Sequence, residues 1–261
     1  MIQEQNIAKP LKFDSKTPEI EIKGLFKSFG KNEVLKGLNL TVNKGENLVI
    51  LGKSGSGKSI AIKCIVGLEV ANKGEIKVFG TDITQLNNAD LNKIRIRIGF
   101  LFQSAALYDS MSVRQNLGFI LKRHHSHLTS KELEKEILAS LEDVGLADAI
   151  DKMPSELSGG MRKRIGLART LILKPEIILY DEPTTGLDTI TSREISELIL
   201  DIQKKNKTTS IIITHDMDCA RLTGNRIVIL NDGVIYAEGS YEELEKSDDK
   251  WVRSFFTQNH H

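Results

Sequence analysis

The chain contains Gly52-Lys53-Ser54-Gly55-Ser56-Gly57-Lys58-Ser59, and this segment decides its fold because it matches the G-x-x-x-x-G-K-[ST] pattern at every fixed position. An apolar run, Asn47 to Leu51, precedes it and predicts a buried strand, and Ile60 to Val66 follows it and predicts a helix. The glycines let backbone N–H groups point inward, and the helix adds its positive dipole end at the same place. The segment therefore predicts a phosphate-binding loop between a strand and a helix.

The residue types within this loop predict separate roles. Lys58 is expected to reach the β- and γ-phosphates of a nucleotide, and the hydroxyl of Ser59 to take a coordination position on Mg²⁺. The alternative is a glycine-rich turn with an exposed lysine, but the four fixed positions coincide by chance in roughly one chain of this length in a hundred. The predicted contacts to the nucleotide come from Gly52, Lys53, Ser54, Gly55, Ser56, Gly57, Lys58, Ser59 and Ile60.

Length and composition set the limits of the protein class. A chain of 261 residues can form one large α/β domain with room for a smaller inserted subdomain. With 36 basic and 35 acidic residues the net charge is +1, which gives no electrostatic case for nucleic acid as a partner. The sequence has no apolar run of membrane-spanning length and no signal-peptide core in residues 1 to 18, so we expect a cytosolic chain. Cys64 and Cys219 are expected to be buried thiols.

Strand-like runs alternate with helical patterns along most of the chain. Residues 1 to 18 predict a flexible leader, and the domain is expected to start with a strand from Glu19 to Phe26. This alternation predicts an α/β fold with a largely parallel, doubly covered sheet, whose ligands bind at the carboxyl ends of the strands. The further predicted strands are Gly74 to Val78, Ile98 to Phe102, Ile177 to Asp181, Ser210 to Thr214 and Arg226 to Leu230.

Helical patterns replace strands between residues 103 and 175, which predicts an inserted helical subdomain. The clearest helix has apolar residues from Leu133 to Val144 on one face, a capping box at Thr129 and Glu132, and Gly145 at its end. The histidine-rich run from Lys122 to His127 is interpreted as a solvated loop rather than a metal or anion site, because it lacks acidic ligands and metal-site spacing. The closing pair His260 and His261 is native or a remnant of expression.

A second set of chemical residues follows the strand Ile177 to Asp181. Asp181 offers the oxygen ligand that Mg²⁺ needs beside a phosphate-binding loop, and Glu182 is suited to activate an attacking water as general base. The alternative is a pair of solvated carboxylates in a strand-end turn. The segment Leu157-Ser158-Gly159-Gly160-Met161 opens a basic helix and predicts another anion site. Both phosphate-binding surfaces serve one nucleotide within a chain, or each chain supplies the second surface to a neighbour.

These motifs together resemble the ordered motif set of the ATP-binding cassette (ABC) ATPases over residues 19 to 240. The set comprises Gly52 to Ser59, Gln103, Leu157 to Gly160, the Asp181-Glu182 pair, Gly186-Leu187-Asp188 and Thr214-His215-Asp216. The resemblance implies a P-loop NTPase cassette with a RecA-like core, an N-terminal antiparallel β subdomain and a helical subdomain over about 104 to 172. It also implies a head-to-tail dimer that holds two ATP molecules, each between the phosphate loop of one chain and the signature of the other.

The resemblance also implies roles for single residues. Phe29 matches the aromatic residue that stacks on adenine, although a core phenylalanine is the alternative. Gln103 matches the residue that senses Mg²⁺, the water and the membrane partner, and His215 matches the switch histidine at the γ-phosphate. Asp188 matches the aspartate that crosses the dimer interface. Ser158, Gly159 and Gly160 match the signature that binds phosphate in trans, and Met161 replaces the commoner glutamine.

The stretches around Gln103 and Met161 are more specifically similar to ATPases of Mla-type phospholipid transporters, an MCE-associated group. That similarity implies a peripheral ATPase on the cytoplasmic face of the inner membrane. Its partners would be a second copy of the chain, an MlaE-like permease, a periplasmic MCE lipid-binding protein and, in addition, a STAS-type accessory protein. Leu107, Tyr108, Met111 and Val113 would then contribute to the groove for the permease, unless they pack the helical subdomain.

The same similarity divides the chain into a cassette, 19 to 245, and a tail, 246 to 261. The tail segment Trp251 to Phe256 is expected to reach the other cassette. Other readings stay open: the ATPase of an importer for another small substrate, a soluble cassette acting in translation or DNA repair, and a scaffold that binds nucleotide without hydrolysis. The intact Glu182 and His215 disfavour the scaffold.

Overall fold

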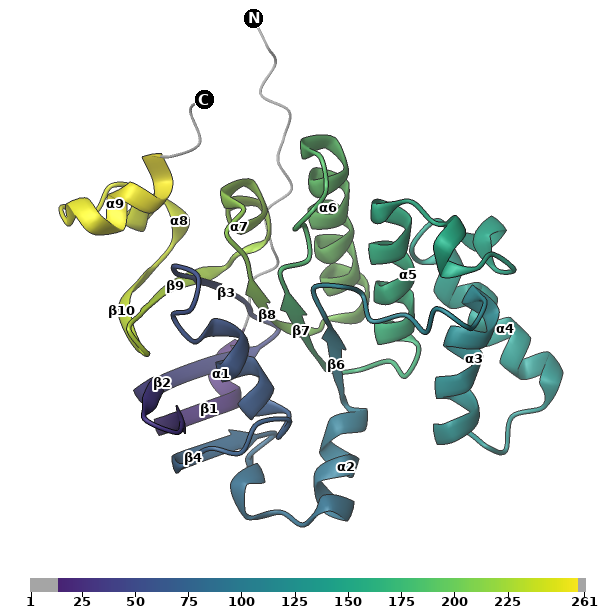
Figure 1. The fold of residues 1–261 in the computed structure, drawn as a ribbon, viewed down its shortest axis with the longest axis horizontal. Helices are drawn as coiled ribbons and strands as arrows, with labels where there is room; N and C mark the ends of the chain where they lie inside the picture. The colour runs from purple at the N-terminus through teal and green to yellow at the C-terminus, as the bar shows by residue number, and fades with distance from the viewer. Residues whose placement is uncertain (1–13, 258–261) are drawn as a thin grey trace, which may run out of the picture.

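The computed structural model describes residues 14–257 and is shown in Figure 1. The interpretations that concern residues 1–13, His260 and His261 lie outside this range. The strands are β1 Asp14–Phe29, β2 Asn32–Lys44, β3 Asn47–Leu51, β4 Lys73–Val78, β5 Thr81–Asp82, β6 Ile98–Leu101, β7 Ile177–Asp181, β8 Thr209–Ile213, β9 Arg226–Asn231 and β10 Val234–Gly239. The α-helices are α1 Lys58–Ile65, α2 Asn88–Ile96, α3 Val113–His124, α4 Ser130–Glu142, α5 Gly159–Leu171, α6 Thr189–Asn206, α7 Met217–Thr223, α8 Tyr241–Glu245 and α9 Lys250–Thr257. Short 3₁₀ turns cover Ile83–Gln85, Ala147–Ala149 and Pro154–Glu156.

A six-stranded sheet in the order β10-β9-β3-β8-β7-β6 forms the centre of the fold. Its strands pair in parallel except for β10, which pairs antiparallel with β9. Every residue of β3, β7 and β8 is buried, as expected for parallel strands covered on both faces. Successive side chains of β7 point to opposite faces of the sheet and belong to two hydrophobic clusters. Ile178 and Tyr180 belong to the cluster under the helices α3 to α7, and Ile177 and Leu179 belong to the cluster between the central sheet and β1 and β2. The predicted, mostly parallel core sheet is confirmed.

A four-stranded sheet in the order β2-β1-β4-β5 packs on one face of the central sheet, and all its pairs are antiparallel. Figure 1 shows this sheet and α1 on the opposite side of the central strands from α6 and α7. The sequence interpretation placed Gly74 to Val78 among the strands of the parallel sheet, and this is wrong, because β4 pairs antiparallel with β1. The first strand also begins at Asp14 rather than at Glu19, so the predicted leader is too long at its carboxyl end.

The helical subdomain consists of α3, α4 and the adjoining face of α5, at the far end of the molecule from β1 (Figure 1). The predicted capping box at Thr129 and Glu132 begins α4, and Ile137 and Leu141 on its inner face are fully buried. The run from Lys122 to His127 is exposed over most of its length, but its first half is the last turn of α3 rather than a loop. Within residues 14–257 no helix is both long and apolar enough to cross a bilayer.

The C-terminal segment packs on its own chain through α9. Val252 is 2% exposed and Phe256 is 6% exposed, and both belong to the same hydrophobic cluster as Ile178 and Tyr180. Trp251 makes an edge contact with Tyr236 at 4.6 Å between ring centroids. These contacts use one face of the helix. The expectation that this tail also reaches a second cassette stays a prediction.

Both cysteines are buried and free, as the sequence predicts. Burial raises the pKa of the Cys64 thiol to about 11 and that of the Cys219 thiol to about 12. The reactive form is the thiolate, so both thiols should resist modification in the folded protein. We expect Ellman's reagent at pH 8 to label neither thiol in native protein and both in guanidinium chloride, and labelling of either native thiol within minutes contradicts this placement.

Candidate nucleotide-binding site

Four neighbouring strands of the central sheet deliver the predicted site residues to one edge. The phosphate-binding loop follows β3 and His215 follows β8. Asp181 ends β7 with Glu182 directly after it, and Gln103 follows β6. These four strands are adjacent and parallel, so their carboxyl ends meet at the same edge of the sheet. The topology thus brings together residues that lie far apart in the sequence.

A pocket of about 650 Å³ lies at this edge. It is large enough for a nucleotide of ordinary ligand size. It brings together the phosphate loop, Gln103, Glu182 and His215, together with Thr185, which the sequence interpretation missed. The lining residues are Phe29, Asn32, Val34, Gly52, Ser54, Gly55, Gly57, Lys58, Ser59, Ile60, Gln103, Glu182, Thr185 and His215.

The backbone of the phosphate loop requires glycine at its two ends. Gly52 has a φ of 154°, and a Cβ atom there would lie 2.3 Å from the carbonyl oxygen of Leu230. Gly57 has a φ of 102°, and a Cβ atom there would lie 2.9 Å from Leu35 Cδ2. Any other residue at either position would have to displace the chain around it. These close approaches hold the loop against β9 and β2.

The loop also has polar groups suited to an anion. Gly57 is the N-cap of α1 and offers no side-chain cap, so the first N–H groups of the helix are available to a phosphate. The buried hydroxyl of Ser56 has no hydrogen-bond partner. Because a buried polar atom without a partner is costly, both observations fit a bound phosphate.

Lys58 lies inside the loop that it is predicted to serve. Its ammonium group donates to the carbonyl oxygens of Gly52 at 2.8 Å and Lys53 at 3.1 Å. Burial lowers the pKa of Lys58, while the nearby carboxylates of Glu182 and Asp181 raise it. The side chain therefore sits between the loop and the two acids at the end of β7.

Ser59 and Asp181 form the pair of oxygen ligands that the sequence predicts for Mg²⁺. The Ser59 hydroxyl donates to Asp181 Oδ1 at 2.8 Å, which joins the first turn of α1 to the end of β7. A hydroxyl and a carboxylate are hard oxygen donors, and Mg²⁺ prefers such ligands beside phosphates. The donor set therefore fits the ion.

Glu182 is held in an unusual backbone conformation with its carboxylate in the pocket. Its φ of 53° lies in the left-handed region, which costs a non-glycine residue roughly 1–2 kcal/mol. Its N–H group donates to the carbonyl of Ile213 at 2.9 Å. The carboxylate oxygen Oε2 lies 2.7 Å from His215 Nδ1 and accepts from the hydroxyl of Thr185 at 3.1 Å. Two side chains therefore fix the direction of this carboxylate.

Phe29 ends β1 at the mouth of the same pocket and is 45% exposed. The ammonium group of Lys27 lies 4.6 Å from the centre of its ring. The alternative of a core phenylalanine is therefore wrong, and the ring is free to stack on a planar ligand.

The signature segment lies outside the pocket of its own chain. Ser158 caps α5 by accepting from the N–H group of Met161 at 3.2 Å, and Asp188 caps α6 in the same way through Thr191 at 3.0 Å. A Cβ atom on Gly160 would lie 2.6 Å from Thr191 Cγ2, so the two helix N-termini are side by side. Within residues 14–257, neither Asp188 nor the signature residues Ser158, Gly159 and Gly160 line the pocket that holds the phosphate loop.

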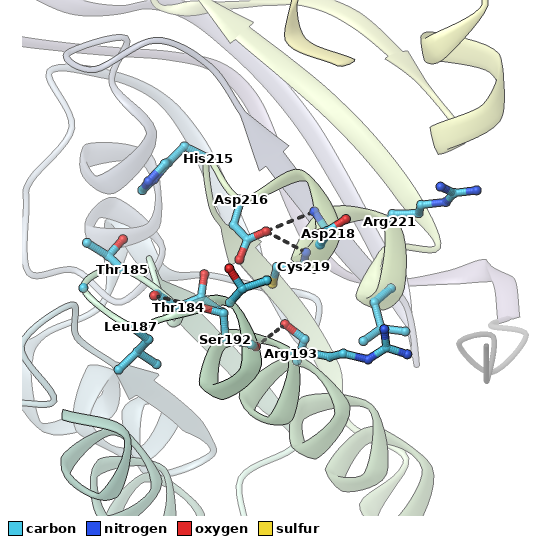
Figure 2. Close-up of a pocket in the computed structure, with 14 residues that line it drawn as sticks. Thr184, Thr185, Leu187, Ser192, Arg193, His215, Asp216, Asp218, Cys219 and Arg221 are labelled. Carbon is cyan, nitrogen blue, oxygen red and sulfur yellow. Dashed lines mark hydrogen bonds between the residues drawn. The ribbon is translucent and has the colours of Figure 1, made fainter. Parts of the chain in front are cut away.

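A second pocket of about 660 Å³ lies between α6 and α7 (Figure 2). It shares Thr185 and His215 with the first pocket. Its Asp216 carboxylate accepts from the N–H groups of Asp218 at 3.0 Å and Cys219 at 3.1 Å, as Figure 2 shows. This carboxylate caps α7, which accounts for its place in the motif without a role in the reaction.

The surface predicted to receive a membrane partner is only partly as expected. Tyr108 is 47% exposed and pairs with Phe119, which the sequence interpretation missed, at 5.7 Å between ring centroids. Leu107 and Met111 are partly exposed. Val113 is fully buried at the start of α3, so its assignment to a groove is wrong and the packing alternative holds for this residue.

Comparison with known proteins shows the family to which the chain is similar. The model of the ABC transporter family matches residues 35–185. The probable ribonucleotide transport ATP-binding protein mkl of Mycobacterium leprae is 41% identical over 90% of this chain and 68% of its own length. The intermembrane phospholipid transport system ATP-binding protein MlaF of Haemophilus influenzae is 40% identical over 90% of this chain and 89% of its own length. The chain thus spans about two thirds of the mycobacterial relative and most of the other.

The fold is also found among solved structures. A dimeric, post-hydrolysis structure of the ATP-binding cassette MJ0796 bound to ADP and Pi has a TM-score of 0.78 and 31% sequence identity. The match covers 85% of this chain and 98% of that protein. The similarity therefore extends over the central sheet, the antiparallel sheet and the helical subdomain.

Proposed function

The chain belongs to the ABC transporter family and is an ABC ATPase, and from this premise we propose that it powers a transporter that moves phospholipid between membranes. One structural observation supports specific residues for the ATPase reaction. The pocket that contains the phosphate loop also contains the carboxylate of Glu182, which His215 and Thr185 hold in place. This arrangement supports Glu182 as a general base that acts beside the γ-phosphate.

Different residues of the chain have different roles in ATP hydrolysis. Phe29 stacks on the base of ATP, and the loop N–H groups and Lys58 bind its phosphates and stabilise the charge that develops on them. Ser59, Asp181 and Gln103 would hold Mg²⁺, which when bound neutralises phosphate charge. Glu182 accepts a proton from the attacking water, and His215 orients the Glu182 carboxylate through its contact at 2.7 Å.

The second phosphate-binding surface would come from another copy of the chain. The signature residues Ser158, Gly159 and Gly160 lie outside the pocket of their own chain, so they are free to contact an ATP held by a partner. Asp188 begins the neighbouring helix and would cross the same interface. Similarity to a cassette solved as a dimer supports a head-to-tail homodimer with two ATP molecules between the chains.

Phospholipid is the preferred cargo because of the similarity to MlaF, which covers 89% of that protein at 40% identity. The same similarity supports an MlaE-like permease, an MCE lipid-binding protein and a STAS-type protein as partners at the cytoplasmic face of an inner membrane. The exposed pair Tyr108 and Phe119 would contact the permease. The similarity to a relative named for ribonucleotide transport keeps a transporter of another small substrate as the alternative.

The cargo can be tested on the complex that copurifies with the chain from its native membranes. We expect mass spectrometry to detect bound phospholipid, and phospholipid vesicles to raise the ATPase rate of the complex in detergent several-fold. Ribonucleoside monophosphates should leave that rate unchanged. Stimulation by such a ribonucleotide without any response to phospholipid would support the alternative and contradict the proposal.

A further inference from the structure

A lysine outside the predicted site residues joins two of the site's segments through their backbone. Lys163 lies on α5 and is only 6% exposed. Its ammonium group donates to the carbonyl oxygen of Gln103 at 2.6 Å and to that of Glu182 at 3.0 Å. We propose that Lys163 is a positioning residue that fixes the backbone of Gln103 and Glu182 for ATP hydrolysis and links both to the signature helix.

Burying the charged ammonium group of Lys163 costs desolvation free energy, so its hydrogen bonds have to offset that cost. Burial lowers the pKa of Lys163, while the carboxylates of Glu182 and Asp181 raise it. Among the interactions of residues 14–257 its ammonium group makes no ion pair with a carboxylate. The two backbone carbonyls therefore supply the hydrogen bonds that a buried ammonium group needs.

Both contacted segments have backbone conformations that need support. Glu182 itself is left-handed, with a φ of 53°, and Ala105 and Ala106, just after Gln103, have φ values of 61° and 48°. Non-glycine residues keep such conformations only where surrounding contacts determine them. Lys163 supplies one such contact to the carbonyl of Glu182 and another at the start of the segment that contains both alanines.

The same face of α5 packs closely on these segments beyond the lysine. A Cβ atom on Gly166 would lie 2.7 Å from the Cβ atom of Ala105. Further along α5, Thr170 packs closely on β6: a Cβ atom on Gly99 of that strand would lie only 2.6 Å from Thr170 Cγ2. Residues three and four apart share one helix face, so Lys163, Gly166 and Thr170 form a continuous contact surface. Lys163 is the end of this surface nearest to Glu182.

The location of Lys163 on α5 connects the two phosphate-binding surfaces of one chain. The helix begins at Gly159, and Lys163 follows after about one turn, or roughly 6 Å along the axis. A displacement of the signature on contact with a partner's ATP would therefore reach Glu182 and Gln103 through this side chain. This step rests on the proposed roles of Glu182, Gln103 and the signature.

The test is Lys163→Met, which keeps most of the apolar stem and removes the donors. We expect kcat for ATP hydrolysis to fall between about tenfold and a hundredfold, the scale of a displaced catalytic group. The Kd for ATP should change less than about threefold, because no phosphate contact is lost. Lys163→Arg, which keeps the charge and several N–H donors, should recover a large part of kcat.

Arg164→Met is the matched control on the same helix. Arg164 donates to the carbonyl of Val144 at 3.2 Å and to Glu194 at 2.8 Å, away from the pocket. Arg164→Met removes the same charge as Lys163→Met but no contact to the site. We therefore expect its kcat to stay within about twofold of wild type while its melting temperature falls modestly. If Lys163→Met is too unstable to assay, kcat should be higher in Lys163→Arg than in Lys163→Gln, because the arginine retains more N–H donors.

Two outcomes overturn the inference. One is unchanged kcat in Lys163→Met, or in Lys163→Gln when it replaces that variant, and the other is a loss of kcat matched by Arg164→Met at equal loss of stability. Glu182→Gln, measured in the same series, separates this failure from that of the proposed function. An inactive Glu182→Gln with an active Lys163→Met refutes the positioning role alone, whereas an active Glu182→Gln refutes the assigned base.

Discussion

Glu182→Gln should bind ATP with near wild-type affinity and hydrolyse it about 10²- to 10⁴-fold more slowly, the usual contribution of a general base. The substitution preserves the size of the side chain and removes its ability to accept a proton. The variant keeps the backbone hydrogen bonds of Glu182 to Ile213 and Lys163, so its fold should be unchanged. Phosphate release under saturating ATP and Mg²⁺ gives the rate, and equilibrium binding of ATP gives the affinity.

The same variant should also accumulate as a dimer in ATP, because it closes on the nucleotide and does not turn it over. Light scattering with and without ATP measures this change. The matched control is Glu176→Gln, which alters the opposite end of the same strand, where Glu176 pairs with Arg97 at the surface. That control should keep kcat within about twofold, since exposed ion pairs contribute little. Near-normal hydrolysis by Glu182→Gln contradicts the assignment of the base.

Lys58→Ala should weaken both ATP binding and turnover, and this double effect distinguishes it from Glu182→Gln. A hydrogen bond to a charged partner is worth about 1.5–3 kcal/mol, so ATP affinity should fall roughly 10- to 100-fold. Turnover at saturating ATP should fall further, because the ammonium group also stabilises charge in the transition state. Calorimetric titration with ATP and phosphate release at saturation measure the two effects separately.

Lys63→Ala is the matched control for Lys58→Ala. Lys63 lies in the last turn of the same helix, away from the phosphate loop, so its removal should cost only a few tenths of a kcal/mol of stability. ATP affinity and kcat should both remain within about twofold of wild type. If the Lys58 and Lys63 variants bind ATP equally well, Lys58 does not contact the phosphates.

The sequence predicted the strands that lead into the site better than the strands at its periphery. The phosphate loop and the acids at the end of β7 follow fully buried apolar strands, and such runs give a strong local signal. The strand β2 gives a weak signal, because buried residues alternate with exposed ones only over Leu38 to Val42 and Val34 and Leu35 are adjacent. The edge strand β10 was also missed, and none of its residues is fully buried.

Single residues were misjudged where burial depends on tertiary contacts. The resemblance to transporter ATPases implied that Val113 contributes to a groove for the permease, with core packing as the alternative, but Val113 begins α3 and is fully buried there. Lys163 lies in a basic helical segment that indicates a solvated face, and only the packing of α5 on the Gln103 segment makes it a buried lysine. No spacing or composition in the sequence distinguishes it from its exposed neighbours.

The order of strands in the central sheet has a consequence for synthesis of the chain. The strand β3 pairs with β8 and β9, and the partner of Asn47 in β8 is Ser210, about 160 residues later in the chain. At about 5–20 residues per second, ribosomes need roughly 8–30 s to make that partner. Until then the apolar β3 has both edges unpaired, so the nucleotide site forms only after about four fifths of the chain has been made. Ribosome-bound chains that end before β8 should therefore fail to bind ATP and should depend on chaperones.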